Sequence, residues 1–353
     1  MSQPCIVITG LGVGGAEQTL LKVLPELDCD PFVISLTDDN TIGEKLEERG
    51  VDVTYLGLNT YLWNLPLVTL RFLTILHKRR PDTMVSFLIH SHLFARFTAP
   101  LYADTIMCSI RLKHKPSLLT YIEYVTNGWV DHYLPNSPAL KPWLNERGVD
   151  DDRITIVPNG VDIDTYDVDI DEDAKREELG IPGDPFVVGS VGRLHKQKRY
   201  NDVLDATKDL DVHVLLVGDG PERDNLQAQA KQNGMADRVH MPGRRDDIPE
   251  ALQVMDVFCL PSENEGMSNA LLEAMAAGRC CVVSDIQENA VVVKEAGITY
   301  EKGFTEGLQL ALEDLIDNEE QRYGLGERAR ELINQAYSKT AMRRGFEEKL
   351  CVA

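Results

Sequence analysis

The sequence predicts an α/β protein built from two doubly wound parallel sheets, each in its own domain. The chain has 353 residues, more than one hydrophobic core usually supports. Short apolar strands alternate with helical stretches in two separate series, a pattern typical of parallel sheets covered by helices on both faces. An acidic stretch at residues 161–185, which contains Gly180, Pro182 and Gly183, separates the two series and indicates a domain boundary.

The first series begins at Cys5–Thr9. No basic run precedes this apolar segment, so we interpret it as a strand and not as a signal peptide. A glycine-rich turn and a helix follow, with Ala16, Leu20 and Leu27 among its apolar positions at helical spacing. Further strands are expected at Phe32–Leu36, Val51–Leu56, Thr83–Leu88, Thr105–Ile110 and Ile154–Val157.

The second series is expected to contain strands at Phe186–Val191, Val212–Val217, Val239–Met241, Asp256–Leu260 and Cys280–Ser284. The tail from about Ser338 onwards is expected to be helical. Ligands of doubly wound sheets bind beyond the carboxyl ends of the strands. The loops that follow these strands are therefore where a functional site is expected.

The composition excludes several classes of protein. With 43% hydrophobic and 26% charged residues the chain is an ordinary globular protein. Its net charge of −21 disfavours nucleic-acid binding, and it resembles the charge of proteins from salt-loving cells. No apolar run reaches 18 residues, so a membrane span is not expected. The seven cysteines lack a C-x-x-C motif and are interpreted as reduced core residues of a cytoplasmic protein, not as disulfides or a zinc site.

The most informative segment is PSENEGMSNALLEAMAAG, at residues 261–278. It follows a short apolar strand, turns, and then enters an apolar helix that Gly278 ends. The first backbone N–H groups of this helix would point out of its positive end, which favours an anion. Glu265 and Glu273 bracket the helix entry and can accept hydrogen bonds from paired hydroxyls, although a solvated helix charge is the plain alternative.

Glycines and cations follow other strands. The run at residues 10–15, GLGVGG, opens a helix and alone would suggest either a dinucleotide site or a tight turn. A dinucleotide site requires an acidic residue about 20 positions further on, at the end of the second strand, but Asp28 and Asp30 precede that strand. In GRLHKQK, Arg193 and Lys198 come after the strand at 186–191. Two cations there can neutralise a diphosphate, while a solvated basic loop is the alternative.

Five segments, in this order along the chain, carry a resemblance to a known family. They are Gly14-Gly15-Ala16-Glu17, Pro158-Asn159-Gly160-Val161-Asp162, Gly192-Arg193-Leu194 with Gln197-Lys198, Gly218-Asp219-Gly220-Pro221 and the paired-glutamate segment. Together they resemble the retaining glycosyltransferases of family 4, which have the GT-B fold. The resemblance implies two Rossmann-like domains facing across a cleft. Residues 1–162 would form the acceptor-side domain, residues 163–337 the nucleotide-sugar domain, and residues 338–353 a helix that crosses back to the first domain.

The resemblance also implies a reaction and a set of roles. A hexose or N-acetylhexosamine would move from a nucleotide diphosphate sugar, with a UDP-sugar favoured, to a hydroxyl of a glycan or a lipid-linked glycan, with retention and with no metal or cofactor. Arg193, Lys198 and Glu265 would be catalytic: Glu265 would hold the sugar, and the two cations the leaving diphosphate. Glu273 would hold the ribose. The remaining donor-binding positions would be Gly14, Gly15, Gly218, Arg245, Gly266, Met267, Ser268, Asn269 and Ala270.

The acceptor side is less specified. The family often carries a histidine near the sugar, and His92, Arg111 and His114 are the candidates here. The segment at residues 284–293 departs from the usual glycine-containing continuation, which leaves the donor sugar open. A nucleotide-sugar epimerase of the same architecture and a non-catalytic nucleotide-sugar-binding partner are the alternatives.

The segment Leu65–Arg80 combines apolar residues with a basic end. A core helix whose basic end complements the helix dipole is one interpretation. Contact with a membrane that bears a lipid-linked acceptor is the other. The protein is accordingly expected in the cytoplasm, with peripheral contact at the inner face of the membrane as an option.

Overall fold

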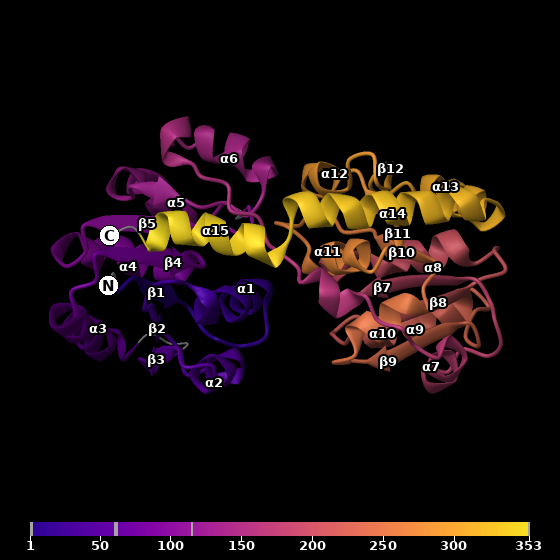
Figure 1. Ribbon diagram of the computed structural model, residues 1–353, viewed down its shortest axis with the longest axis horizontal. Coiled ribbons are helices and arrows are strands. Elements are labelled where there is room, and N and C mark those ends of the chain that lie inside the picture. The colour runs from indigo at the N-terminus through magenta and orange to yellow at the C-terminus, as the bar shows by residue number, and fades with distance from the viewer. Residues whose placement is uncertain (1–2, 60–62, 114–115, 352–353) are drawn as a thin grey trace. The chain divides into compact units, whose positions relative to one another are not determined.

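The computed structural model describes residues 3–59, 63–113 and 116–351. The chain divides into two compact units (Figure 1). Unit 1 comprises residues 1–160 together with 339–353, and unit 2 comprises residues 161–338. Each unit is described below by itself.

The sheet of unit 1 is parallel and has the strand order β3-β2-β1-β4-β5-β6. Its strands are β1 (Cys5–Ile8), β2 (Phe32–Ser35), β3 (Asp52–Tyr55), β4 (Thr83–Phe87), β5 (Thr105–Ser109) and β6 (His132–Tyr133). Most strand residues are buried, as expected when helices cover both faces of a parallel sheet.

Two layers of helices cover this sheet. One face packs against α1 (Gly15–Val23), α2 (Thr41–Glu48) and α15 (Lys339–Leu350). The other face packs against α3 (Leu65–Arg79) and α4 (Ile89–Thr98). Helix α5 (Leu118–Val125) lies against α4, and the short α6 (Lys141–Asn145) contributes to a smaller cluster beside β5 and β6.

Unit 2 has a second parallel sheet, with the order β12-β11-β10-β7-β8-β9. Its strands are β7 (Val187–Val191), β8 (His213–Val217), β9 (Val239–Gly243), β10 (Val257–Leu260), β11 (Cys280–Ser284) and β12 (Ile298–Tyr300). One face is covered by α10 (Ile248–Gln253), α11 (Asn269–Ala276), α12 (Gln287–Val293) and α14 (Glu319–Ala336). The other is covered by α8 (Tyr200–Thr207), α9 (Arg223–Gln232) and α13 (Thr305–Asp317). Helix α7 (Glu172–Glu178) precedes the sheet.

The predicted class, two doubly wound parallel sheets, is confirmed, and ten of the eleven predicted strands lie within one or two residues of an observed one. The prediction of a strand at Ile154–Val157 is wrong, because Ile154 makes only an isolated bridge to Tyr133. Strands β6 and β12 were not expected. Because they have two and three residues, they are too short to show a periodic pattern.

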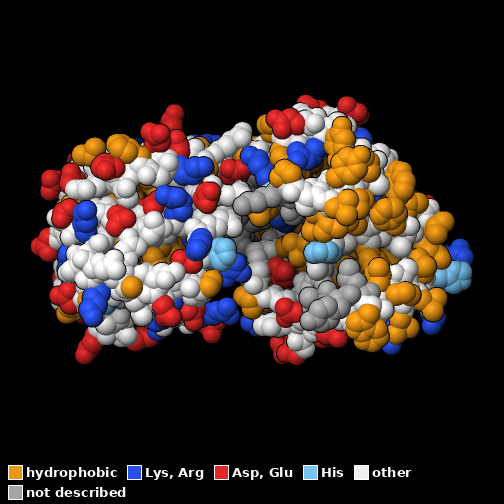
Figure 2. Space-filling view, turned by 180° about the vertical axis from the view of Figure 1, so that it is seen from behind, with side chains coloured by type: hydrophobic (Ala, Val, Ile, Leu, Met, Phe, Trp, Pro, Cys, Tyr) orange, Lys and Arg blue, Asp and Glu red, His pale blue; other side chains and the backbone are white. Residues whose placement is uncertain are grey.

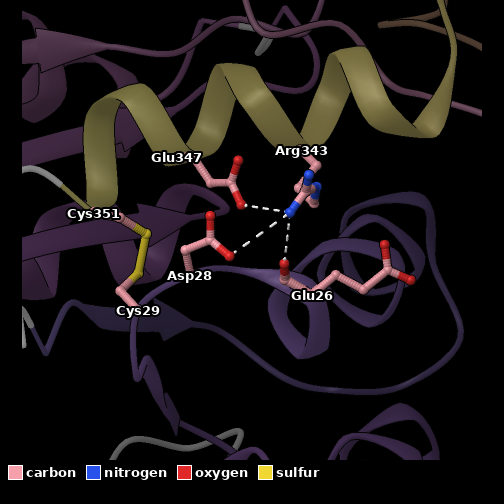
Figure 3. The surroundings of a disulfide bond; sticks show 6 residues. All are labelled: Glu26, Asp28, Cys29, Arg343, Glu347 and Cys351. Atoms are coloured by element: carbon pink, nitrogen blue, oxygen red, sulfur yellow. Dashed lines mark hydrogen bonds and ion pairs between the residues drawn. A yellow bond between two sulfur atoms is a disulfide. The ribbon is translucent and has the colours of Figure 1, made fainter.

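The last helix belongs to unit 1, where α15 contacts α1. Phe346 of α15 is buried and stacks on Phe87 of β4, with ring centroids 6.3 Å apart. The prediction that all cysteines are reduced is wrong for two of them, since Cys29 and Cys351 form a disulfide that fastens the end of α15 to the segment before β2 (Figure 3). The other five, Cys5, Cys108, Cys259, Cys280 and Cys281, are free and buried. The argument from cysteine content for a reducing compartment therefore no longer holds.

Ion pairs surround this disulfide (Figure 3). Arg343 of α15 donates to the Glu26 backbone carbonyl at 3.2 Å and pairs with Glu347 at 2.9 Å. Lys339, at the start of the same helix, pairs with the Glu26 carboxylate. The returning helix is thus held by an aromatic contact, a covalent bond and charged groups.

The segment at residues 65–80 forms α3, whose Val68, Phe72 and Leu76 are buried in the core while Leu67 and Leu70 are exposed. Among the described residues, no helix is long and apolar enough to cross a membrane.

Candidate functional site

A lysine–glutamate pair marks the carboxyl edge of the unit 2 sheet. Strands β7 and β10 are neighbours and run parallel, so the loops that follow them emerge side by side. Lys198 from the first loop and Glu265 from the second form an ion pair, with 2.6 Å between Nζ and Oε1. The side chains are 19% and 10% exposed, so the pair is largely withdrawn from water. Sequence reasoning placed both at the donor site, and the structure brings them together.

A third side chain completes this pair. Ser262 lies two residues beyond β10 and is buried, and its hydroxyl donates to the same Glu265 oxygen at 2.6 Å. The second oxygen, Oε2, has no hydrogen-bond partner among the residues that the structure describes. One Glu265 oxygen is therefore fixed by the protein, and the other is open to an added donor such as a sugar hydroxyl.

Backbone contacts hold the two loops against each other. The side-chain amide of Gln197 donates to the Asn264 carbonyl at 2.6 Å, and the Glu263 N–H donates to the Gln197 carbonyl at 2.8 Å. These contacts fix the loop that carries Lys198 against the loop that carries Glu265, which is the preorganisation that a binding site needs.

Arg193 lies on the same edge, two residues beyond β7, and its side chain is exposed. It forms no ion pair with any residue in the described ranges. A guanidinium without a protein counter-charge at the end of a parallel strand is suited to bind a phosphate.

Two glycines let the β7 and β8 loops approach closely. Gly192 and Gly218 have φ of 150° and 142°, which L side chains rarely adopt, and a Cβ on Gly218 would collide with the Gly192 carbonyl oxygen. Gly218 was predicted as a donor-binding position, and in the structure it lies against the loop that carries Arg193.

The loop that carries Glu265 leads into the amino end of α11. Ser268 is the N-cap, and its hydroxyl accepts from the Leu271 N–H at 3.4 Å. Met267 and Ser268, which the sequence predicted as donor-binding positions, are buried. The first N–H groups of α11, including that of Ala270, point out of the helix end, next to Gly266 and Asn269.

Glu273 lies one turn into α11 and is half-buried. It hydrogen-bonds the hydroxyl of Tyr166, a buried residue whose pKa is raised by burial and by this carboxylate. The carboxylate proposed for ribose is therefore already held in place by a tyrosine.

Arg245 is tied to protein carboxylates. It pairs with Asp247 and Glu178, and Lys175 pairs with both of these acids as well. The hydrogen bond from Arg245 is the main cause that holds the pKa of Asp247 well below its usual range. A contact between Arg245 and a base would have to compete with this network.

In unit 1, Gly14 is the N-cap of α1 and Gly15 its first residue. Arg111 follows β5 and donates to Asn159 at 2.7 Å, and its Nε and Nη2 atoms are buried with no hydrogen-bond partner among the described residues. Burial lowers the pKa of Arg111 to about 9, against the opposing charge of Glu17.

Of the two histidine candidates for the acceptor side, the structure describes one. His92 is 1% exposed and its Nδ1 lies 2.8 Å from the Ser86 hydroxyl, a core position that gives an acceptor no access. His114 lies outside the described residues.

Sequence reasoning missed three residues of the unit 2 site. Ser262 had a local signal, since it stands three residues before Glu265 at the end of a strand. Tyr166 had none, because only long-range packing brings it to Glu273. Tyr200 stands two residues after Lys198 in the sequence, and its buried hydroxyl lies close to Gly192. No cluster of three or more potential metal ligands occurs within the part of the chain that the structure describes.

Two family models together match most of the chain. Residues 13–165 match the model described as Glycosyltransferase Family 4, and residues 171–332 match the model described as Glycosyl transferases group 1. The chain belongs to the group 1/family 4 glycosyltransferases, which have the GT-B fold. The membership of family 4 that the sequence suggested is thereby confirmed.

Characterised relatives match over part of their length. The chain is 36% identical over 160 residues to the UDP-Gal:alpha-D-GlcNAc-diphosphoundecaprenol alpha-1,3-galactosyltransferase of Escherichia coli, which covers 43% of this chain and 41% of that protein. It is 32% identical over 168 residues to the N-acetyl-alpha-D-glucosaminyl L-malate synthase of Bacillus anthracis, covering 46% and 44%. The chain thus matches less than half the length of these two relatives.

Solved structures match over the whole chain. Anabaena HepE in complex with UDP-glucose superposes with a TM-score of 0.89 and 20% identity, covering 99% of this chain and all of that one. The apo form of the lipopolysaccharide outer core galactosyltransferase WaaB gives a TM-score of 0.73 at 22% identity, covering 99% and 98%. At such identities these likenesses establish the fold alone.

Proposed function

We propose that this protein transfers a hexose or N-acetylhexosamine from a nucleotide diphosphate sugar, a UDP-sugar above all, to a hydroxyl of a glycan or lipid-linked glycan, with retention of configuration. The observation that carries the proposal is the Lys198–Glu265 pair at the carboxyl edge of the unit 2 sheet, with Arg193 beside it. The similar Escherichia coli enzyme uses UDP-Gal by name, and the similar Anabaena structure contains UDP-glucose. Both support a uridine nucleotide here.

The residues of unit 2 suit distinct parts of the donor. The open Oε2 of Glu265 accepts hydrogen bonds from the sugar hydroxyls, and Glu273 accepts hydrogen bonds from the ribose hydroxyls. Arg193 and Lys198 bind the diphosphate, together with the outward N–H groups of α11.

In the proposed reaction, the bond between the sugar's anomeric carbon and the diphosphate oxygen breaks and leaves an added negative charge on that oxygen. The two cations stabilise this charge as it develops. The acceptor hydroxyl bonds to the anomeric carbon and passes its proton to the departing phosphate oxygen, so no side-chain nucleophile takes part.

The experiment is a thermal-shift screen with UDP, GDP and ADP, followed by transfer assays with the matching nucleotide sugars. A ligand at one hundred times its dissociation constant should stabilise the folded protein by about 2.7 kcal/mol. Stabilisation without transfer to any hydroxyl acceptor would favour the non-catalytic binding partner. Interconversion of the donor sugar without an acceptor would favour the epimerase.

The proposal includes independence from divalent metal, because Arg193 and Lys198 would neutralise the diphosphate without an ion. Activity is expected to survive EDTA. Complete loss of activity, with recovery on adding magnesium or manganese, would overturn this part of the proposal.

The proposal also includes contact between unit 1 and a membrane that carries the acceptor. Several large apolar side chains around α5 are exposed: Phe97, Leu101, Leu118, Tyr121, Tyr124, Val125 and Trp129. Figure 2 shows hydrophobic side chains gathered over much of one face of unit 1. Residues 97–129 contain only two acidic residues, Asp104 and Glu123, in a chain that has 57, and Glu123 is buried. Tyrosine and tryptophan with few charges suit the boundary between lipid and water.

Flotation with phosphatidylcholine vesicles tests this contact. The double variant Leu118→Ser/Tyr121→Ser should lower vesicle binding by about tenfold or more, because each side chain buries apolar surface worth about 1–2 kcal/mol. Leu310→Ser is the matched control, since Leu310 of unit 2 and Tyr121 are each 63% exposed. Equal loss in both variants, or no binding by the wild type, would contradict the assignment.

A further inference from the structure

Lys198 and Glu265 neutralise each other in the ligand-free site, although the proposed function gives each a separate part of the donor. Their atoms are 2.6 Å apart. When a diphosphate binds, the Lys198 ammonium is drawn toward it. Glu265, which is 8% exposed, then loses part of its compensating charge, and a buried carboxylate with too few donors is costly.

The hydroxyl of Tyr200 can supply the hydrogen-bond donor that Glu265 then lacks. It is the first residue of α8, is 2% exposed, and its hydroxyl has no hydrogen-bond partner among the described residues. A Cβ on Gly192 would lie 2.7 Å from this hydroxyl and 3.8 Å from the Cε atom of Lys198. The hydroxyl therefore lies directly beneath the loop that carries Lys198.

The environment of this hydroxyl includes Glu265. Burial is the main cause that raises the pKa of Tyr200, and the charge of Glu265 is the other. A buried hydroxyl without a partner costs about 1–3 kcal/mol, and phenylalanine would fill the same space without that cost. Packing alone thus gives no reason for a tyrosine at this position.

We propose that Tyr200 is a positioning residue whose hydroxyl donates a hydrogen bond to Glu265 when Lys198 turns to the donor diphosphate. The Tyr200 hydroxyl thus replaces the Lys198 ammonium as a hydrogen-bond donor to the Glu265 carboxylate, while the second carboxylate oxygen holds the sugar. The inference rests on the roles that the proposed function gives to Lys198 and Glu265.

Lys198 leaves Glu265 only for a ligand that carries a β-phosphate, so ligands with and without this group test the proposal. Tyr200→Phe should weaken UDP binding by about tenfold or more, the effect of losing a hydrogen bond to a charged group. Binding of UMP, which lacks the β-phosphate, should change by less than about twofold, because Lys198 then stays with Glu265. The thermal midpoint of the ligand-free variant should not fall, since the wild-type hydroxyl makes no bond there.

Tyr300→Phe is the matched control. Tyr300 is also buried, and its hydroxyl has no hydrogen-bond partner among the described residues, but its charged neighbours are Asp202, Arg199 and Asp285. It should leave the affinities for UDP and UMP unchanged. Isothermal titration calorimetry of the full-length protein and both variants provides the comparison.

The outcomes separate this inference from the proposed function. Wild-type protein that binds UDP, with equal affinity in Tyr200→Phe, overturns the role of Tyr200 alone. Equal weakening of UDP and UMP, or a lower midpoint without ligand, shows a merely structural role and also overturns it. If the wild type binds no nucleoside diphosphate, the proposed function fails and this inference fails with it.

Discussion

Replacing Lys198 by methionine should affect both stability and catalysis, and the two effects can be separated. The substitution keeps the length of the side chain and removes the charge, so the Glu265 side chain, which is 10% exposed, retains Ser262 as its only hydrogen-bond donor among the described residues. Removing one partner of a fully buried ion pair costs about 3–5 kcal/mol. Because Ser262 remains and the pair is partly hydrated, we expect about 2 kcal/mol for Lys198→Met.

The double variant Lys198→Met/Glu265→Gln isolates the interaction. Glutamine carries no charge and can still bond Ser262, so the double variant should regain most of the lost stability. Activity should not return, because kcat falls by about a hundredfold to a thousandfold when one transition-state charge stabiliser is lost. Together with the single variant Glu265→Gln, which completes the cycle, these values should give a coupling free energy of about 2 kcal/mol or more between the two sites.

The assay must report on unit 2. All three tryptophans, Trp63, Trp129 and Trp143, belong to unit 1, so their emission reports unit 1 alone. Denaturant unfolding should be followed by far-UV circular dichroism, with tryptophan emission recorded alongside to separate the units. A coupling energy below about 0.5 kcal/mol, or recovery of activity in the double variant, would refute the reasoning.

Three further predictions concern other parts of the molecule. Glu273→Ala should weaken UDP binding by about tenfold through the lost acceptor, whereas Tyr166→Phe should leave it nearly unchanged; calorimetry showing equal affinities would contradict the ribose role. Cys29→Ser should destabilise unit 1 by about 2–4 kcal/mol, seen in tryptophan emission, and dithiothreitol should reproduce the loss in the wild type only. Burial raises the pKa of Glu123 from 4.5 to about 7, so the folded state binds its proton more tightly than the unfolded state does. This contribution is fully present below pH 4.5 and is lost as pH rises to about 7, in total about 3 kcal/mol. Glu123→Gln should remove that part of the pH dependence, and an unchanged slope would contradict it.

The sequence predicted the elements whose information is local. Strands such as Asp256–Leu260 and Cys280–Ser284 are apolar runs closed by turn residues, and each appears within a residue of its expected bounds. Arg193 and Glu265 were placed at strand ends for the same reason. That they share one edge follows from the pairing of β7 with β10, which strand order along the chain does not specify.

Features that depend on distant packing were not predictable in this way. Cys29 and Cys351 are separated by 322 positions, and no pattern around either indicates the other. Tyr166 and Tyr200 look like ordinary apolar-face residues in the sequence. Only the folded chain shows that one bonds Glu273 and the other lies beneath the Lys198 loop.

Charge placement at the donor site explains how so acidic a chain can bind an anion. The net charge is −21, and its long-range field disfavours a nucleoside diphosphate. Lys198 already has a carboxylate partner, so a diphosphate there replaces one ion pair with another and gains little net attraction. Arg193 is exposed and has no ion-pair partner within the described residues, so it supplies the uncompensated positive charge. Added salt screens the repulsive field over about 10 Å at 0.1 M but affects close contacts less. Moderate salt should therefore strengthen donor binding to this protein, and Arg193→Ala should weaken it at every salt concentration.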